Sequence, residues 1–307
     1  MTDAIQSTTK REPKRIGILL GRVPQLNTSA LRFLVLQMNT LQNSFEYEFL
    51  PAAPGFECKY LPGEYEFWPT TLQDDFCLML STDSSVDREV VRANARKFLE
   101  DHRKYLQELI DEYKLRESLP DYFVLITMAR FSDEYYSMRV PGLSILAFGN
   151  WERTMAPPSI LEFIFTSILR ESIAVVSRSL RGSIHLGTKG CLLDFTPSLD
   201  EAKFKVLGGF ICNYCSKALE SEGLNGVQQD LTKLLSKDWL GKSDEPQTPA
   251  GIISNLGFDL FLTKGLKPSF RERLLSAIEQ EGVKEVLKFI SALLVAAALV
   301  WLGLKGK

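Results

Sequence analysis

The chain has 307 residues, of which 24% are charged, and its 36 lysines and arginines nearly balance 38 aspartates and glutamates. The net charge of −2 is not that of a dedicated nucleic-acid binder, and the length suits one sizeable domain with an appendage. Only two histidines are present, which excludes an imidazole-rich metal site. The odd number of cysteines, five, and the lack of a signal-peptide-like apolar core near residue 1 favour a reducing compartment.

The first predicted elements alternate between strand and helix. Residues 1–14 are polar and are predicted to be disordered. The apolar run 15–20 predicts a buried strand, the spacing of apolar residues over 27–41 predicts a helix, and the alternation over 45–49 predicts a second strand. This order favours an α/β fold.

A long irregular segment and a long helix follow. Residues 51–75 contain four prolines that interrupt any regular element. Over 86–113 the chain is highly charged, with apolar residues at helical spacing, and this predicts an amphipathic helix with one solvated face. His102 lies in that helix without a second metal ligand at a recognised spacing, so we expect a half-exposed structural histidine there.

The next segments predict the core of the domain. Two apolar runs, 122–127 and 143–148, predict buried strands, with a turn or irregular strand at 133–136 between them. A largely buried helix is predicted to begin at residues 157–159, with its two prolines in the first turn, and to continue to about Leu180.

Four residues have the spacing of a closed metal site. Cys191 follows His185 after five intervening residues, and Cys212 and Cys215 form a Cys-x-x-Cys after twenty more. Two thiolates at this separation can bind one ion at about 2.3 Å, and a third cysteine with a histidine completes the tetrahedral Cys₃His set of structural Zn²⁺ sites. Because four protein ligands leave no open position, the predicted zinc stabilises the fold and does not activate water.

Two alternatives concern the same residues. A Cys-x-x-Cys can be a redox pair, but this one follows a strand-like Gly-Gly-Phe-Ile and has no tryptophan-rich or proline-bearing surroundings, which favours the metal. Asp194 is an alternative oxygen ligand to His185. We expect residues 192–195 to form a short strand in which the Asp194 carboxylate caps backbone groups instead.

The run from His185 reads His-Leu-x₄-Cys-Leu-Leu-Asp-Phe-Thr-Pro-Ser-Leu and continues to Phe-Ile-Cys-Asn-Tyr-Cys at Cys215. It resembles the C-terminal half of the archaemetzincin family of zinc metallopeptidases, whose pattern is HExxHxxGxxHC followed by further cysteines and a CxxC. In this comparison Gly182 falls on the family's glycine and His185 on its third histidine, while the three cysteines fall on structural-zinc cysteines. The resemblance covers about residues 120–215 and implies a zincin-like fold.

The departures from that pattern remove the peptidase chemistry. Val175 and Val176 occupy the positions of the first histidine and the glutamate base, and Ser179 occupies that of the second histidine. A zincin needs these ligands to hold its catalytic zinc and the glutamate to deprotonate the bound water. Leu186 also replaces the first structural cysteine, so we expect His185 to complete the structural site instead.

The end of the chain predicts a membrane anchor. Residues 236–285 are expected to be a linker with a basic amphipathic stretch, and residues 289–304 carry no charge between Lys288 and Lys305. As a helix, these sixteen residues span about 24 Å, and flanking lysines extend the reach towards a hydrocarbon core of about 30 Å. The basic residues before the segment favour a cytoplasmic N-terminal domain. The alternative is a core helix packed on the domain.

The sequence therefore predicts an α/β (α+β), zincin-like mixed sheet with long helices, a structural zinc element and a C-terminal transmembrane helix. The expected organisation is a disordered N-terminus (1–14), a zinc-stabilised domain (15–235), a linker (236–285) and a tail anchor (286–305) in a single-pass membrane protein. We expect a non-catalytic binding or effector module with a protein partner or another ligand, no nucleic acid, and room for oligomer formation.

Two other functions stay open at this point. One is a hydrolase with a non-standard active site, for which Glu152, Glu162 and Glu171 are the only clustered carboxylates near the degenerate cleft. The other is a membrane-perturbing effector that acts through its C-terminal helix, although that segment shows no polar lining.

Overall fold

The computed structural model describes residues 12–21, 23, 26–51, 80 and 85–258. A five-stranded sheet in the order β2-β1-β4-β7-β6 organises these residues. Its strands are β1 (Lys14–Leu20), β2 (Phe45–Phe49), β4 (Tyr122–Thr127), β6 (Ser137–Val140) and β7 (Leu143–Ala147). All neighbours pair in parallel except β6, which runs antiparallel to β7 at one edge. The predicted α/β class and mixed sheet are therefore confirmed.

The first crossover shows how local sequence directs the fold. Helix α1 (Thr28–Met38) begins where the Asn27 side chain accepts a hydrogen bond from the Ala30 backbone at 2.9 Å. After the helix, the Asn39 amide bonds both backbone groups of Tyr47 at 2.8 Å, which fixes the return into β2. The parallel β1–α1–β2 unit follows from these two contacts.

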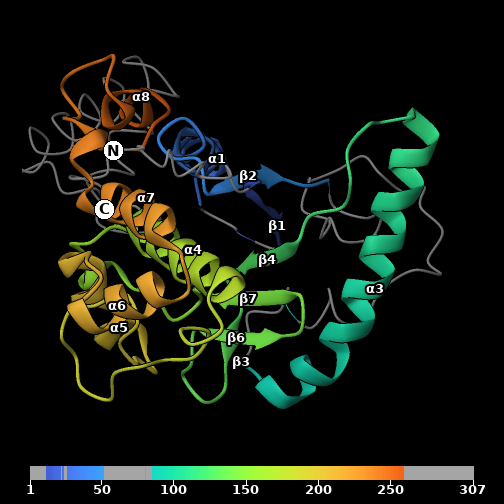
Figure 1. Ribbon diagram of the computed structural model, residues 1–307, viewed down its shortest axis with the longest axis horizontal. Coiled ribbons are helices and arrows are strands. Elements are labelled where there is room, and N and C mark those ends of the chain that lie inside the picture. Colours follow the sequence, from blue (N-terminus) through green and yellow to red (C-terminus); the bar gives the residue numbers. More distant parts are fainter. Residues whose placement is uncertain (1–11, 22, 24–25, 52–79, 81–84, 259–307) are drawn as a thin grey trace, which may run out of the picture. The chain divides into compact units, whose positions relative to one another are not determined.

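Helices cover both faces of the sheet (Figure 1). Helix α3 (Arg88–Tyr113) lies on one face, and its apolar side chains form one buried cluster with alternate strand residues such as Phe123 and Leu125. Helices α1 and α4 (Ile160–Val176) lie on the other face. Successive strand side chains point to opposite faces, so β4 and β7 are buried on both sides and read as continuous apolar runs.

The predicted environment of His102 was wrong. Its ring is buried, with 2% exposed, and stacks on Phe98 with the ring centroids 5.7 Å apart. The helix turns this position towards the sheet, and the ring edge also faces Phe123. Burial lowers the pKa of His102 to about 4, because desolvation penalises the imidazolium.

Helix α4 begins and ends differently from the prediction. The two prolines precede the helix, and Ser159 caps it in a capping box with Glu162, with hydrogen bonds of 3.3 and 2.8 Å. The helix ends at Val176, because Ser177 has extended backbone angles, φ −106° and ψ 123°. Its apolar spacing therefore does not extend to Leu180, which is buried in the loop that follows.

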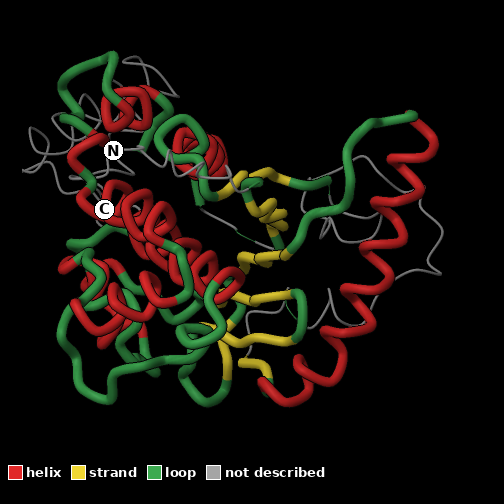
Figure 2. The backbone as a smooth tube through the Cα atoms, in the orientation of Figure 1, coloured by secondary structure: helices red, strands yellow, loops and turns green. Residues whose placement is uncertain are grey.

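The C-terminal part of the described chain is helical (Figure 2). It contains α5 (Leu199–Gly208), α6 (Asn213–Ser221), α7 (Asn225–Ser236), the 3₁₀ helix η3 (Asp238–Leu240) and α8 (Pro249–Asn255). Three short elements remain: the strands β3 (Ser85–Val86) and β5 (Arg130–Phe131), which pair in parallel, and the 3₁₀ helix η2 (Arg153–Met155).

Part of the predicted linker is folded. Helix α8 buries Ala250 and Ile253 completely, and the Asn27 side chain donates to the Leu256 carbonyl at 2.5 Å, next to α1. Residues 238–258 therefore pack on the domain, whereas 259–285 lie outside the described residues. Residues 52–75 of the predicted irregular segment also lie outside them.

The predicted membrane anchor at 286–305 lies outside the described residues as well. Within the part of the chain that the structure describes, no helix has the length and apolar character needed to cross a bilayer.

Candidate metal centre

The Cys-x-x-Cys pair lies at the start of α6. Cys212 is the N-cap residue, with extended backbone angles, and Cys215 lies in the first turn, so both sulfurs are on the side of the helix N-terminus. The unpaired backbone N–H groups and the helix dipole at this end favour thiolates. The Cys212 backbone N–H also donates to the Cys191 sulfur at 3.4 Å, which links the pair to the third cysteine.

Two glycines allow the chain to bring Cys191 next to this helix. Gly208, at the end of α5, lies so close to Gly190 that a Cβ on it would be 2.8 Å from the Gly190 carbonyl oxygen. Gly209 then ends α5 with a left-handed φ of 55°. The strand-like interpretation of Gly-Gly-Phe-Ile was thus wrong: the glycines form a helix end, and only Phe210 bridges to Cys191.

The loop that carries His185 is held by Asp194. One oxygen of its carboxylate accepts hydrogen bonds from the backbone N–H of Lys189 at 2.6 Å and of Cys191 at 3.1 Å. A bridge between His185 and Asp194 closes the loop, in which the Phe195 N–H donates to the His185 carbonyl at 2.8 Å. The predicted short strand is therefore reduced to isolated bridges, and the predicted backbone role of the Asp194 carboxylate is confirmed.

The structure brings all four predicted ligand residues together. Their ligand atoms lie within 4.8 Å of one another, and His185 Nε2 lies 3.1 Å from the Cys212 sulfur and 3.2 Å from the Cys215 sulfur. Ligand atoms around one tetrahedral Zn²⁺ are about 3.5–3.8 Å apart, given bonds of about 2.0–2.3 Å. Small side-chain shifts would open this cluster to that size, so the four residues can hold one metal ion.

The thiols perturb one another electrostatically. The Cys215 thiol and the backbone N–H of Leu193 and Cys212 donate to the Cys191 sulfur, which lowers the pKa of Cys191 to about 5 despite its burial. The pKa of Cys215 is raised, because its proton is held by Cys191 and because the site is buried next to that charge. None of the three cysteines is in a disulfide.

The positions of the family's catalytic residues do not form a second site. Val175 and Val176 end α4, and Ser179 lies beyond the helix, so positions 175 and 179 are not one turn apart on one helix as HExxH requires. Glu222 accepts hydrogen bonds from the Ser179 backbone and hydroxyl, and from the backbone of Arg178. These bonds join the end of α4 to the end of α6.

The three glutamates of the hydrolase alternative are separated. Glu162 caps α4 and pairs with Lys237 at 3.0 Å, whereas Glu152 is exposed. Glu171 is nine residues after Glu162 on the same helix, or about 13 Å along its axis at 1.5 Å per residue. It is 1% exposed and is bound by Arg139 and Arg170. This arrangement gives no pair of carboxylates that could act on one bond.

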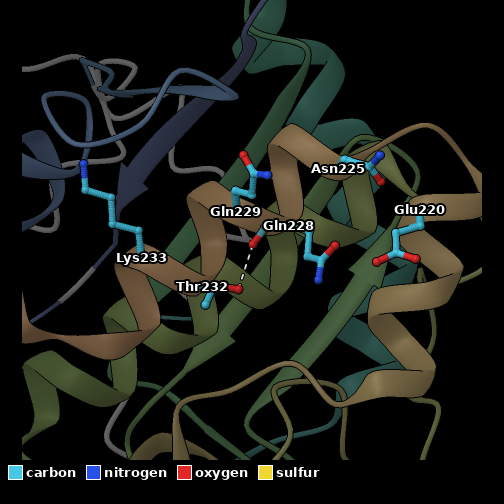
Figure 3. Close-up of a pocket in the computed structure, with 6 residues that line it drawn as sticks. All are labelled: Glu220, Asn225, Gln228, Gln229, Thr232 and Lys233. Carbon is cyan, nitrogen blue, oxygen red and sulfur yellow. Dashed lines mark hydrogen bonds between the residues drawn. The ribbon is translucent and has the colours of Figure 1, made fainter.

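A surface hollow of about 670 Å³ lies along α6 and α7. Its lining is polar and almost entirely exposed: Glu220, Asn225, Gln228, Gln229, Thr232 and Lys233. Figure 3 shows these side chains spread along the two helices, with the only charged groups, Glu220 and Lys233, at opposite ends. The lysine donates to the Leu41 carbonyl at 2.8 Å. No group of side chains converges there on a ligand.

A smaller cavity, of about 240 Å³, lies between α3, β6 and the segment that follows Asp194. Arginines dominate its wall, and the buried Lys205 of α5 adds a further positive charge. The sequence analysis did not identify this cavity. The residues come from six separate segments, and no motif in the sequence joins them.

Comparison of the chain with family models, with curated proteins and with solved structures gives no match. The resemblance to archaemetzincins therefore rests on the spacing of histidine and cysteine residues alone.

Proposed function

We propose that the chain is a non-catalytic, zinc-stabilised binding module of zincin-like type that is tethered to a membrane. The observation that carries the zinc assignment is the convergence of His185, Cys191, Cys212 and Cys215 within 4.8 Å. Three thiolates and one imidazole are the donor set of structural zinc, and soft sulfur ligands disfavour Mg²⁺ or Ca²⁺. With all four positions taken by protein, the metal holds the loop against α6 and offers no site for water.

Exposed apolar residues around this centre support a role in binding. Leu186 is 92% exposed, and Phe204, Phe210 and Tyr214 are 41–67% exposed. Leu186, Phe210 and Tyr214 lie within two residues of a candidate ligand residue in the sequence, and the Tyr214 ring is 6.1 Å from that of His185. Large apolar groups that remain exposed near a rigid centre are typical of surfaces that bind a protein partner.

Membrane tethering is supported by the sequence of residues 289–304. The segment is uncharged and lies between two lysines, and basic residues are frequent before it. An arginine at the centre of a short span costs about 2.5–3.5 kcal/mol on insertion scales. Ala297→Arg should therefore move much of the protein from the membrane to the soluble fraction, whereas Ala297→Leu should not. If Ala297→Arg fractionates as the unmodified chain does, tethering by this segment is wrong.

Metal analysis tests the zinc assignment. We expect one zinc per chain in protein purified without chelator, and a Co²⁺-substituted form with the visible absorption of a tetrahedral thiolate centre. The redox alternative predicts a different result: the purified protein contains no metal, and Cys212 and Cys215 form a disulfide under mild oxidation.

The two histidines provide a matched control for the fourth ligand. His185→Gln should alter the Co²⁺ spectrum and weaken zinc binding, because it replaces an imidazole ligand. His102→Gln changes the only other histidine, which is buried against α3 and the sheet, and should leave the spectrum unchanged. Identical spectra for both variants would remove His185 from the site.

A further inference from the structure

The cavity of about 240 Å³ beside β6 contains an unusual concentration of positive charge. Its wall includes four arginines and one lysine, and no carboxylate lines it. The cationic residues are Arg88, Arg92, Arg139, Arg170 and Lys205. They come from α3, β6, α4 and α5, so the tertiary fold alone brings them together.

The neighbouring carboxylates neutralise only part of this charge. Arg88 pairs with Asp133 at 2.7 Å, and Arg92 pairs with Glu89 at 2.7 Å. Arg139 and Arg170 share the single carboxylate of Glu171. One of those two arginines is therefore without a carboxylate of its own.

Lys205 is the most informative residue of the wall. Lys205 is only 3% exposed. Among the described residues, no carboxylate forms an ion pair with its ammonium group. The ammonium group has one hydrogen bond, of 3.4 Å, to the Asp194 carbonyl, and lies 5.5 Å from the centre of the Tyr136 ring. An ammonium has three donors, and burying one without a negative partner is costly. An anion in the cavity would remove that cost.

A second donor at the same cavity also lacks a partner. The Arg88 guanidinium carbon lies over the Tyr135 ring, 4.0 Å from its centre, and within the described part of the chain the buried Nε–H makes no hydrogen bond. Ser137 and Thr196 also line the cavity, and the Thr196 hydroxyl is hydrogen-bonded to the Tyr136 hydroxyl at 2.8 Å. The cavity thus combines excess positive charge with unused donors.

We infer that this cavity binds a phosphate group, either as the free ion or as the monoester of a small ligand. A phosphate monoester carries up to two negative charges and several strong acceptor oxygens, which matches an uncompensated lysine together with arginines better than a singly charged carboxylate does. The volume admits a phosphate group and part of its substituent. Tyr135 and Phe195, whose ring centres are 6.3 Å apart, form an apolar part of the wall beside it.

The wall that holds Lys205 continues from the metal centre. In the segment 194–196, the Asp194 carbonyl accepts a hydrogen bond from Lys205, and Phe195 and Thr196 line the cavity. The Phe195 N–H donates to the carbonyl of His185, which belongs to the metal centre. The inference names a ligand class for the proposed binding module. It rests on the proposed function in one respect, which is that the zinc would order this wall of the cavity.

Calorimetric titration of the full-length protein with inorganic phosphate and with adenosine 5′-monophosphate, at constant ionic strength, tests the inference. Adenosine and acetate serve as controls that lack the phosphate group. Binding of either phosphate probe, but of neither control, is expected. Tighter binding of adenosine 5′-monophosphate than of inorganic phosphate identifies an esterified ligand. Tighter binding of inorganic phosphate identifies the free ion. Absence of binding by both phosphate probes at millimolar concentration overturns the proposal.

Two matched variants on α5 distinguish the cavity from general surface charge. Lys205→Met should weaken phosphate binding about tenfold or more, the typical loss of a charged hydrogen-bonding group. Lys203→Met makes the same change of charge two residues away, outside the cavity lining, and should leave binding within about twofold. Equal effects of the two variants would overturn the proposal.

Arg92→Gln covers the case in which Lys205→Met does not fold, because the Arg92 side chain is 46% exposed and its loss should be tolerated. It should weaken phosphate binding about two- to fivefold through the lost charge. Wild-type affinity in folded Lys205→Met would overturn the proposal, and so would wild-type affinity in Arg92→Gln if Lys205→Met does not fold. Zinc content, measured on the same samples, separates the two proposals. One zinc per chain without phosphate binding contradicts only the proposed cavity ligand. Phosphate binding without zinc contradicts only the proposed metal centre.

Discussion

Two regions of the molecule are stabilised in different ways. The first is the sheet with its covering helices α1, α3 and α4, here called the sheet body. The second is residues 185–215, here called the Cys–His segment. In the sheet body, β4 and β7 bury almost every side chain. In the Cys–His segment, six large hydrophobic residues remain exposed, among eleven in all the described residues: Leu186, Phe195, Phe204, Leu207, Phe210 and Tyr214. A short segment that leaves so much apolar surface in water needs a cross-link, which the proposed metal with its four ligands would supply.

The largest expected effect tests that cross-link. Cys215→Ser should abolish zinc binding and unfold the Cys–His segment, because metal binding and folding are coupled at such sites. Zinc content and backbone hydrogen exchange of residues 185–215 measure it. Ser216→Ala, the neighbouring change on the same helix, should retain the metal. If Cys215→Ser leaves exchange in the segment unchanged, the segment does not depend on a cross-link.

A core substitution should affect the other region selectively. Leu125 is completely buried between the sheet and α3, so Leu125→Ala should lower the free energy of unfolding of the sheet body by about 2–5 kcal/mol. Zinc content should stay at its original value. Chemical denaturation together with metal analysis measures both. Loss of zinc in the folded variant would show that the two regions are not energetically separate.

His102 provides a pH test of the sheet body. Burial lowers its pKa to about 4 in the folded chain, against about 6.5 when unfolded. Between these values the unfolded chain binds the proton and the folded chain does not, so stability is complete above about pH 6.5 and decreases as the pH falls towards 4.

The expected loss between pH 7 and pH 5 is about 2 kcal/mol from this group. Denaturation of the wild type and of His102→Gln at both pH values isolates it, since acid release of metal affects both proteins equally. A loss of the same size in His102→Gln would show that His102 is not responsible.

The smallest expected effect concerns a contact between the loop that follows α4 and the end of α6, the helix that begins in the Cys–His segment. Hydrogen bonds from the Ser179 hydroxyl and from the backbone of Ser179 and Arg178 lower the pKa of the exposed Glu222 carboxyl. The charged form is favoured in the folded chain, so this contribution is present above the ordinary pKa of a glutamate and is lost as the pH falls through the lowered one.

Glu222→Gln should cost less than about 1 kcal/mol, because exposed carboxylates contribute little. Thermal denaturation measures this change, and Glu220→Gln on the same helix is the control. A cost as large as that of Leu125→Ala would contradict the expectation that this exposed contact contributes little.

Much of the sheet body and the identity of the ligand residues follow from the sequence. Continuous apolar runs predict β4 and β7 because strands buried on both faces leave no polar positions. The convergence of His185, Cys191, Cys212 and Cys215 was predictable because residue type and spacing, notably in Cys-x-x-Cys, are constrained by the size of one ion. Both signals are local in the chain.

Only the tertiary structure decided the features that depend on distant neighbours. The exposure of His102 depends on which helix face meets the sheet, and α8 is folded because it packs on α1, more than 200 residues earlier. The end of α4 at Val176 reflects the loop held by Glu222, not the apolar spacing, which continues to Leu180. The cationic cavity exists because α3, β6, α4 and α5 meet there, and charge that is dispersed along a sequence carries no sign of where the fold will concentrate it.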